Sequence, residues 1–188
     1  MAHNGVQDDP LRRHLLVLRC QAGDEQAFSE LYDRFHRRTL RYLQGLLDEQ
    51  AAQDVQQEVW LTVFQKIAML ANPNGFRTWL YRTTRHRAID FLRREKRQSD
   101  LLKAVEDDLA DVSIRLVDEP LPPPGSPYLD AAMARLSSTH RDVLILRFWE
   151  GMSYAEIALI VGCSIGTVRS RIHHAKRNIK NALEGAPL

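Results

Sequence analysis

The sequence contains little cysteine and no long apolar run. Its two cysteines, Cys20 and Cys163, lie far apart and belong to no CxxC or Cys/His spacing. This excludes a disulfide framework, argues against a structural zinc site and indicates a reducing compartment. Near the N-terminus the longest apolar stretch, residues 15–18, is too short for a signal peptide or a membrane span. We therefore expect a cytoplasmic protein without membrane insertion.

The motifs of common enzyme classes are also missing. The sequence has no Gly-rich phosphate loop, no nucleophile elbow and no metal-ligand motif, so we expect neither catalysis nor a cofactor. His173 and His174 are adjacent, and adjacent helical side chains point about 100° apart, which argues against a shared metal. No stretch alternates between apolar and polar residues for long enough to predict a strand. The fold class predicted is all-α.

Positive and negative charges nearly balance over the whole chain but not along it. The 188 residues include 26 Lys and Arg against 24 Asp and Glu, a net charge of +2. Residues 77–97 have eight basic and two acidic residues, and residues 163–183 have five basic and none acidic. Residues 48–58 have four acidic residues, and residues 100–119 have seven acidic against two basic. The two basic zones are candidates for contact with nucleic acid.

A proline-rich stretch divides the chain into two helical blocks. Five of the eight prolines fall within residues 120–127, after the acidic residues 100–119. Proline favours an extended spacer and removes backbone donors, so this segment is predicted to be a linker. We expect an N-terminal segment (1–23), a first domain (24–97), a linker (98–128), a second domain (129–184) and a short tail (185–188).

Helical periodicity places three helices in the first domain. Apolar residues recur at helical spacing through residues 28–46 and again through residues 55–67. After a loop at residues 71–75, a third helix is predicted over about residues 76–97. Its apolar face holds Leu80, Thr84, Ala88 and Phe91, and its other flank is basic. Trp79 lies at the border of that flank, where it either packs into the core or stacks on a base.

The second domain has the pattern of a helix-turn-helix. Ser153 and Glu156 have the spacing of a capping box, and Gly162 is placed to end the helix that follows. Ser164 is placed to cap the next helix, in which Val168, Ile172, Ala175 and Ile179 form one apolar row. The remaining surface of that helix is polar and basic and fits a DNA major groove.

The acidic zone at residues 48–58 lies on the second predicted helix. Asp54, Gln57 and Glu58 are polar positions beside the apolar Val55 and Val59. Two interpretations stay open: a solvated acidic face, or a docking surface for a basic or polar partner helix.

Three segments together resemble a known family. DVQQEVWLTVFQKI (54–67), FRTWLYRTTRHRAIDFLRREKR (76–97) and LSSTHRDVLILRFWEGMSYAEIALIVGCSIGTVRSRIHHAKRNI (136–179) resemble, in order and spacing, sigma domains two and four of bacterial extracytoplasmic-function (ECF) sigma factors. The resemblance implies a subunit that binds core RNA polymerase through its β′ coiled coil and β flap. It also implies recognition of the −10 and −35 promoter elements, help in strand opening, and an anti-sigma factor as a partner.

The resemblance also implies roles for individual residues. Asp54, Gln57 and Glu58 would bind the polymerase. The −10 element would be contacted by Asn72, Asn74, Phe76, Trp79, Arg82, Arg85, His86 and Arg93. The −35 element would be contacted by Ser164, Thr167, Arg169, Ser170, Arg171, His173, His174 and Arg177. Two positions depart from the family: His86 stands where Asn is usual, which bears on −10 preference, and Ser137 stands where Pro is usual.

One alternative comes from another functional class. The chain would then be an autonomous DNA-binding regulator that uses only the C-terminal helix-turn-helix, with the first domain as a sensor or dimerisation unit. Residues 76–97 discriminate between the two, because a sensor does not need a second basic, aromatic-bearing helix.

Overall fold

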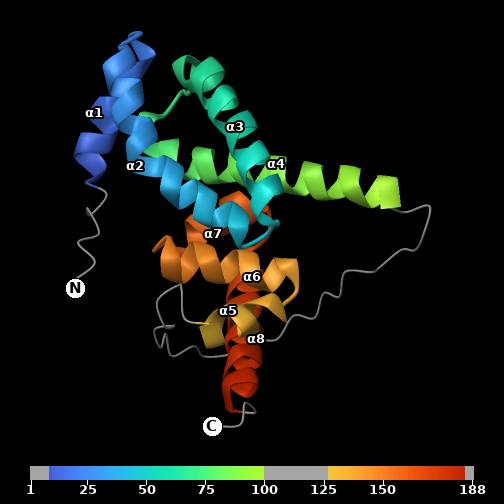
Figure 1. The fold of residues 1–188 in the computed structure, drawn as a ribbon. Helices are drawn as coiled ribbons and strands as arrows, with labels where there is room; N and C mark the ends of the chain where they lie inside the picture. The colour runs from blue at the N-terminus through green and yellow to red at the C-terminus, as the bar shows by residue number, and fades with distance from the viewer. Residues whose placement is uncertain (1–8, 100–126, 185–188) are drawn as a thin grey trace.

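The computed structural model describes residues 9–99 and 127–184, and every regular element in these ranges is helical. Figure 1 shows two groups of helices. The first group contains α1 (Pro10–Gln21), α2 (Glu25–Gln44), α3 (Glu49–Lys66) and α4 (Phe76–Ser99), with two 3-10 turns, Ile67–Met69 and Pro73–Gly75, before α4. The second contains α5 (Pro127–Ala134), α6 (Ser138–Leu144), the π-helical turn η3 (Ile145–Trp149), α7 (Tyr154–Val161) and α8 (Ile165–Glu184). The all-α prediction is confirmed.

Aspartates begin the first three helices. The carboxylates of Asp9, Asp24 and Asp48 accept hydrogen bonds from the backbone N–H groups of Leu11, Ala27 and Ala51, at 2.9–3.0 Å. Each satisfies a donor that the helix itself leaves unpaired and places negative charge at the positive end of the helix dipole. Two of the three helices predicted from periodicity, α2 and α3, therefore start at an aspartate cap, as does α1, which the sequence analysis did not predict.

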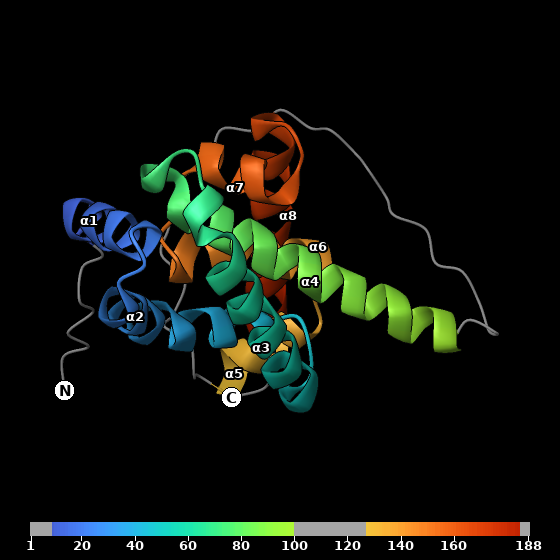
Figure 2. The same ribbon diagram turned by 90° about the horizontal axis from the view of Figure 1, so that it is seen from above.

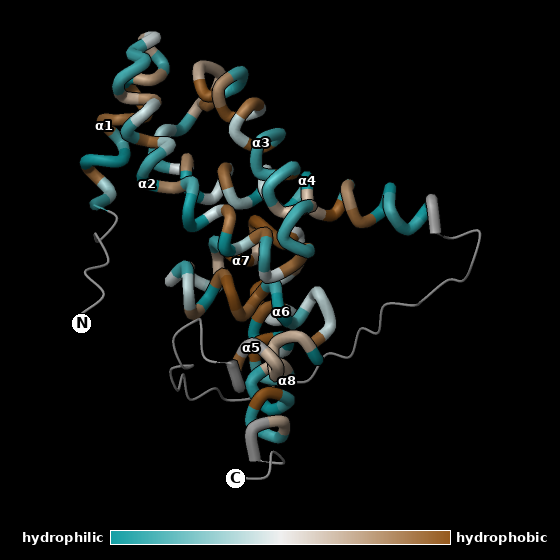
Figure 3. Tube along the Cα trace, in the orientation of Figure 1, coloured by the Kyte–Doolittle hydropathy of each residue, from teal (hydrophilic) through white to brown (hydrophobic). Residues whose placement is uncertain are grey.

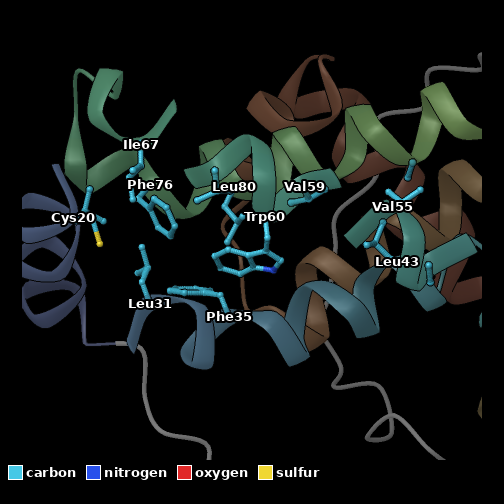
Figure 4. Packing of buried hydrophobic residues seen from close by; sticks show 14 of the residues in the cluster. Cys20, Leu31, Phe35, Leu43, Val55, Val59, Trp60, Ile67, Phe76 and Leu80 are labelled. Carbon is cyan, nitrogen blue, oxygen red and sulfur yellow. The ribbon is translucent and has the colours of Figure 1, made fainter. Parts of the chain in front are cut away.

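The apolar faces of these helices meet in one core. Leu31 and Phe35 from α2 pack with Val59 and Trp60 from α3 and with Phe76 from α4, as Figure 4 shows. The rings of Phe35 and Phe76 meet edge to face, with centroids 5.6 Å apart. Such pairs add about 0.5–1.5 kcal/mol to the free energy gained by burying the rings.

Helix α1 belongs to this core, although it lies ahead of the first domain expected from the sequence. Leu16, Val17 and Cys20 are buried against α2 and the turn that follows α3. The Gln21 side-chain amide also donates to the backbone carbonyls of Ile67 and Leu70, at 3.1 and 2.8 Å. The segment before residue 24 therefore contributes to the packing of the first helical group.

The helix-turn-helix forms as the sequence predicts. The Ser153 hydroxyl and the Glu156 carboxylate each accept a backbone N–H of the other residue, which completes the capping box at the start of α7. Such a cap is worth about 1 kcal/mol. Gly162 ends α7 at φ +77°, a left-handed conformation that side-chain-bearing residues rarely adopt. The predicted apolar row of α8 is fully buried: Val168, Ile172, Ala175 and Ile179.

The two groups contact each other through α4 and the C-terminal part of α2. Helix α4 lies beside α7 in both views, while its C-terminal half projects away from the rest of the molecule (Figures 1 and 2). Figure 3 shows polar and apolar residues alternating along most helices, as expected for elements buried on one side only. Within residues 9–99 and 127–184, no helix has the length and apolar character needed to cross a membrane. Most of the expected linker, and the tail, lie outside the described residues.

Candidate nucleic-acid and polymerase interface

Helix α4 has the predicted apolar and basic sides. Leu80, Thr84 and Ala88 are fully buried, and Phe91 packs partly buried against the first core. On the other side Arg82, His86 and Arg93 are exposed. These three predicted −10 residues share an accessible face that can meet an anionic strand.

The environment of His86 sets its charge. Partial burial, reinforced by the nearby positive charges of Arg82 and Arg85, lowers the pKa of His86 below its ordinary value. At neutral pH its imidazole is therefore uncharged, with one ring nitrogen as a donor and the other as an acceptor. Such a group can hydrogen-bond a base edge but adds no positive charge toward a phosphate.

Arg85 does not share the exposure of its neighbours. Its guanidinium Nε lies 2.6 Å from the carboxylate of Asp142 in α6, and only 17% of its side chain is exposed. In this arrangement the Arg85 guanidinium, which is predicted to contact the −10 element, is already paired with the Asp142 carboxylate.

The loop before α4 contains two predicted −10 residues and leads to two aromatic ones. Asn72 and Asn74 are exposed, and the Asn72 side chain accepts the Asn74 N–H at 3.0 Å, which fixes the turn. Trp79 is half-buried, with its ring 6.0 Å from that of Phe76. Phe76 is fully buried in the first core. In this arrangement its ring packs α4 onto α2, and its predicted DNA contact stays a prediction.

Helix α8 presents its N-terminal end and one basic flank. The Ser164 hydroxyl accepts the Thr167 N–H at 3.0 Å and lies 2.9 Å from the Thr167 hydroxyl, which caps the helix. Arg169 is exposed, and its guanidinium lies 5.7 Å from the centre of the Tyr154 ring in α7. A cation over an aromatic face is held in place at little cost in solvation. The contact with the Tyr154 ring therefore helps to hold the exposed Arg169 side chain in place near the start of α8.

The other predicted −35 residues differ in exposure. Arg177 is exposed, with its guanidinium 3.2 Å from His174 Nδ1, whereas Arg171, His173 and His174 are half-buried. Ser170 is only 6% exposed, although it lies on the side of α8 opposite the apolar row. Its predicted base contact stays a prediction. Among the described residues, no three His, Cys, Asp or Glu side chains gather closely enough to hold a metal ion.

Helix α3 carries a mixed acidic and apolar outer face. The predicted polymerase-binding residues Asp54, Gln57 and Glu58 are all exposed there. Leu61 and Phe64 continue the same helical face, with exposed fractions of 59% and 62%. The sequence analysis missed these two residues; the available signal was helical spacing, since Leu61 is four residues after Gln57 and three after Glu58, and Phe64 is three residues after Leu61. Exposed large apolar side chains beside charges are typical of a protein-binding surface.

Comparisons with known proteins cover both helical groups. The family described as Sigma-70 region 2 matches residues 31–98, and Sigma-70 region 4 matches residues 127–179. The ECF RNA polymerase sigma-E factor of Haemophilus influenzae is 30% identical over 184 residues, covering 94% of this chain and 97% of the relative. The RNA polymerase sigma-H factor of Pseudomonas aeruginosa is 32% identical over 178 residues, covering 90% and 92%.

The chain belongs to the ECF sigma factors. It is therefore a subunit that acts with core RNA polymerase in promoter-directed transcription initiation. This sigma factor has the two family regions in the order that the resemblance implied, and no finding favours an autonomous regulator.

Solved structures show the same fold. CnrH in complex with the cytosolic domain of CnrY superposes with a TM-score of 0.67 at 19% identity, covering 94% of this chain and 99% of the other. The sigma factor RpoE of Bartonella quintana, in complex with the anti-sigma factor NepR, gives 0.67 at 21% identity, covering 85% and 98%. The fold of this sigma factor is thus that of known two-domain relatives.

Proposed function

We propose that this sigma factor divides promoter recognition between its two exposed basic faces. The α4 face contacts the −10 element through Arg82, His86 and Arg93, with Asn72 and Asn74 beside it. The N-terminal half of α8 contacts the −35 element. The expected domains, 24–97 and 129–184, then act as two binding units on one promoter.

The observation that carries this proposal is the match of both sigma regions to segments that contain a basic helix. Residues 77–97 have eight basic against two acidic residues, and residues 163–183 have five against none. Each of these helices also buries an apolar row that fixes which side faces outward. Contacts between such faces and the DNA phosphates position a protein on the duplex, while a few side chains that reach the base edges distinguish the bases.

We assign core-polymerase docking to the outer face of α3. Asp54, Gln57 and Glu58 supply hydrogen-bond acceptors and charge, and Leu61 and Phe64 supply apolar area. Interfaces draw most of their binding energy from such apolar anchors surrounded by polar groups. The helices that α3 packs against most extensively are α2 and α4 of its own group, so docking on its outer face leaves the main contacts between the two helical groups in place.

An anti-sigma factor is the second protein partner that we propose. The support is indirect: the similar structures of CnrH and of the Bartonella quintana RpoE each contain such a complex or a partner domain. The chain would act inside the cell and by binding rather than by catalysis.

The direct test is reconstitution. Purified sigma factor mixed with core RNA polymerase should co-elute with it. The reconstituted holoenzyme should also support run-off transcription from the sigma factor's own promoter, which is first located by transcribing genomic DNA fragments and mapping the start sites. Core polymerase alone is the control. Binding to duplex DNA as a free dimer, without association with the polymerase, would overturn the proposal.

A further inference from the structure

Two buried carboxylates of the second helical group bind arginines and tyrosines of the first. Asp142, in α6, is 3% exposed. Its two carboxylate oxygens accept from the Tyr42 hydroxyl of α2 and from Arg85 Nε of α4, each at 2.6 Å. The Tyr42 side chain is itself fully buried, among residues of the second core. Asp142 thus joins α6 to both α2 and α4.

Glu150, which directly follows η3, makes a parallel set of contacts. Its side chain is 1% exposed, and its carboxylate accepts from Arg38 of α2, with Nη2 at 2.8 Å and Nε at 3.0 Å. The same carboxylate accepts the Tyr81 hydroxyl of α4, and the Glu150 backbone carbonyl accepts from Arg77. The second group therefore supplies both acids, and the first group supplies the arginines and both tyrosine hydroxyls.

Close packing completes this contact. A Cβ atom added to Gly45, at the end of α2, would lie 2.2 Å from Ile145 Cδ1 in η3. The Gly45 carbonyl also accepts from Arg141 Nη1 at 3.0 Å. Gly45 has an ordinary right-handed backbone, so its φ alone does not require glycine, although an added Cβ atom would also lie 3.2 Å from the Tyr42 carbonyl oxygen of α2. A side chain at this position would therefore displace the Ile145 side chain of the second group.

From this geometry we propose that Asp142 and Glu150 form an intramolecular latch that holds the two helical groups closed and competes with promoter DNA for Arg85 of α4. The latch is these two carboxylates with Arg38, Arg85, Tyr42 and Tyr81. A buried charge without its partner is strongly unfavourable, so the closed arrangement requires both pairs to be made. On opening, the same arginines become available to phosphates, which bind guanidinium groups as carboxylates do.

The two DNA-binding helices are affected differently by closure. Arg85 of α4 is held by Asp142, whereas Arg169 and Arg177 of α8 stay exposed. The latch therefore withholds Arg85 from the −10 strand, while Arg82, His86 and Arg93 of α4 and the −35 surface stay accessible. This inference rests on the proposed role of α4, but the closure of the two groups is measurable without it.

Two variants open the latch by independent routes. Asp142→Asn combined with Glu150→Gln removes both charges with little change in shape. Gly45→Leu leaves every charge in place and separates α2 from η3 sterically. Asp33→Asn, at an exposed carboxylate of α2, is the control for lost negative charge. Small-angle X-ray scattering measures the radius of gyration, circular dichroism measures helix content, and binding of a mixed-sequence single-stranded DNA oligonucleotide is measured by fluorescence anisotropy.

Both opened variants should keep their helix content, show a larger radius of gyration than the parent, and bind the oligonucleotide about tenfold more tightly. A tenfold change corresponds to an open fraction of about one tenth in the parent, since apparent affinity scales with the competent fraction. Asp33→Asn should match the parent. An unchanged radius of gyration in both variants would overturn the latch, and opening without tighter binding would overturn the competition. Should the double variant lose helix content, Gly45→Leu decides alone. Failed run-off transcription with an intact latch would instead count against the proposed function.

Discussion

Arg169 is the residue whose predicted role in −35 recognition is best supported by its position. It is exposed near the start of α8 and is held over the Tyr154 ring. If it contacts a base edge, Arg169→Ala should cost about 1–3 kcal/mol in promoter binding and relax preference at one −35 position. Transcription from a library of −35 variants, with the reconstituted holoenzyme, measures both effects.

The matched control for Arg169 is another exposed arginine of the second helical group. Arg135→Ala removes the same charge outside α8 and should leave base preference unchanged. If Arg169→Ala weakens all promoters equally, its contact is with a phosphate and the base-contact assignment is wrong.

Individual side chains show where sequence reasoning succeeds and where it stops. Periodicity correctly separated the buried row of α8 from its polar surface, because a helix repeats its faces regularly. The DNA contacts of Ser170 and Phe76 were predicted from the family resemblance, and the burial of both side chains in this arrangement was not visible from the sequence. The contact of Arg85 with Asp142 lies between residues 57 positions apart and leaves no periodic signal.

At the scale of an element, α3 combines charge and exposed apolar area on one face. Asp54→Arg reverses a charge at the N-terminal end of that face and should raise the dissociation constant for core polymerase roughly tenfold or more, about 1.4 kcal/mol. Because Asp54 is exposed, the helix itself should stay folded. Co-elution with core polymerase and circular dichroism measure the two quantities.

The control variant is Asp33→Arg, at an exposed position of α2. It changes the net charge of the protein by the same amount as Asp54→Arg but leaves the α3 face unaltered. Equal loss of polymerase binding in both variants would indicate a long-range charge effect. Undiminished binding by Asp54→Arg would refute the docking face.

Whole elements were more predictable than their arrangement. The caps, the turn glycine and the apolar rows all lie within a few residues in sequence, so helix positions followed from local pattern. The contact of α4 with α7 depends on packing between the two groups, for which the near-neutral composition gave no indication. The acidic and basic zones visible in the sequence also did not include Asp142 and Glu150, the two carboxylates that matter most for closure.

For the whole molecule, closure places two tyrosine hydroxyls out of water. Burial, together with the charge of Asp142, raises the pKa of Tyr42 well above its ordinary value. Burial and Glu150 do the same for Tyr81, while Arg85 near Tyr42 and Arg38 and Arg77 near Tyr81 oppose the rise. The raised pKa values mean that closure is favoured while both phenols are neutral, below about pH 10, and is lost as pH rises above that value.

Alkaline titration should therefore open the molecule before its helices melt. The radius of gyration should increase together with phenolate absorbance as the pH rises above about 10, while circular dichroism still reports folded helices. A Tyr42→Phe, Tyr81→Phe double variant should lack this tyrosine-linked step, because it has no buried phenol to ionise. A parent that stays compact until helix content falls would show that ionisation of these groups is coupled to global unfolding rather than to separation of the two helical groups.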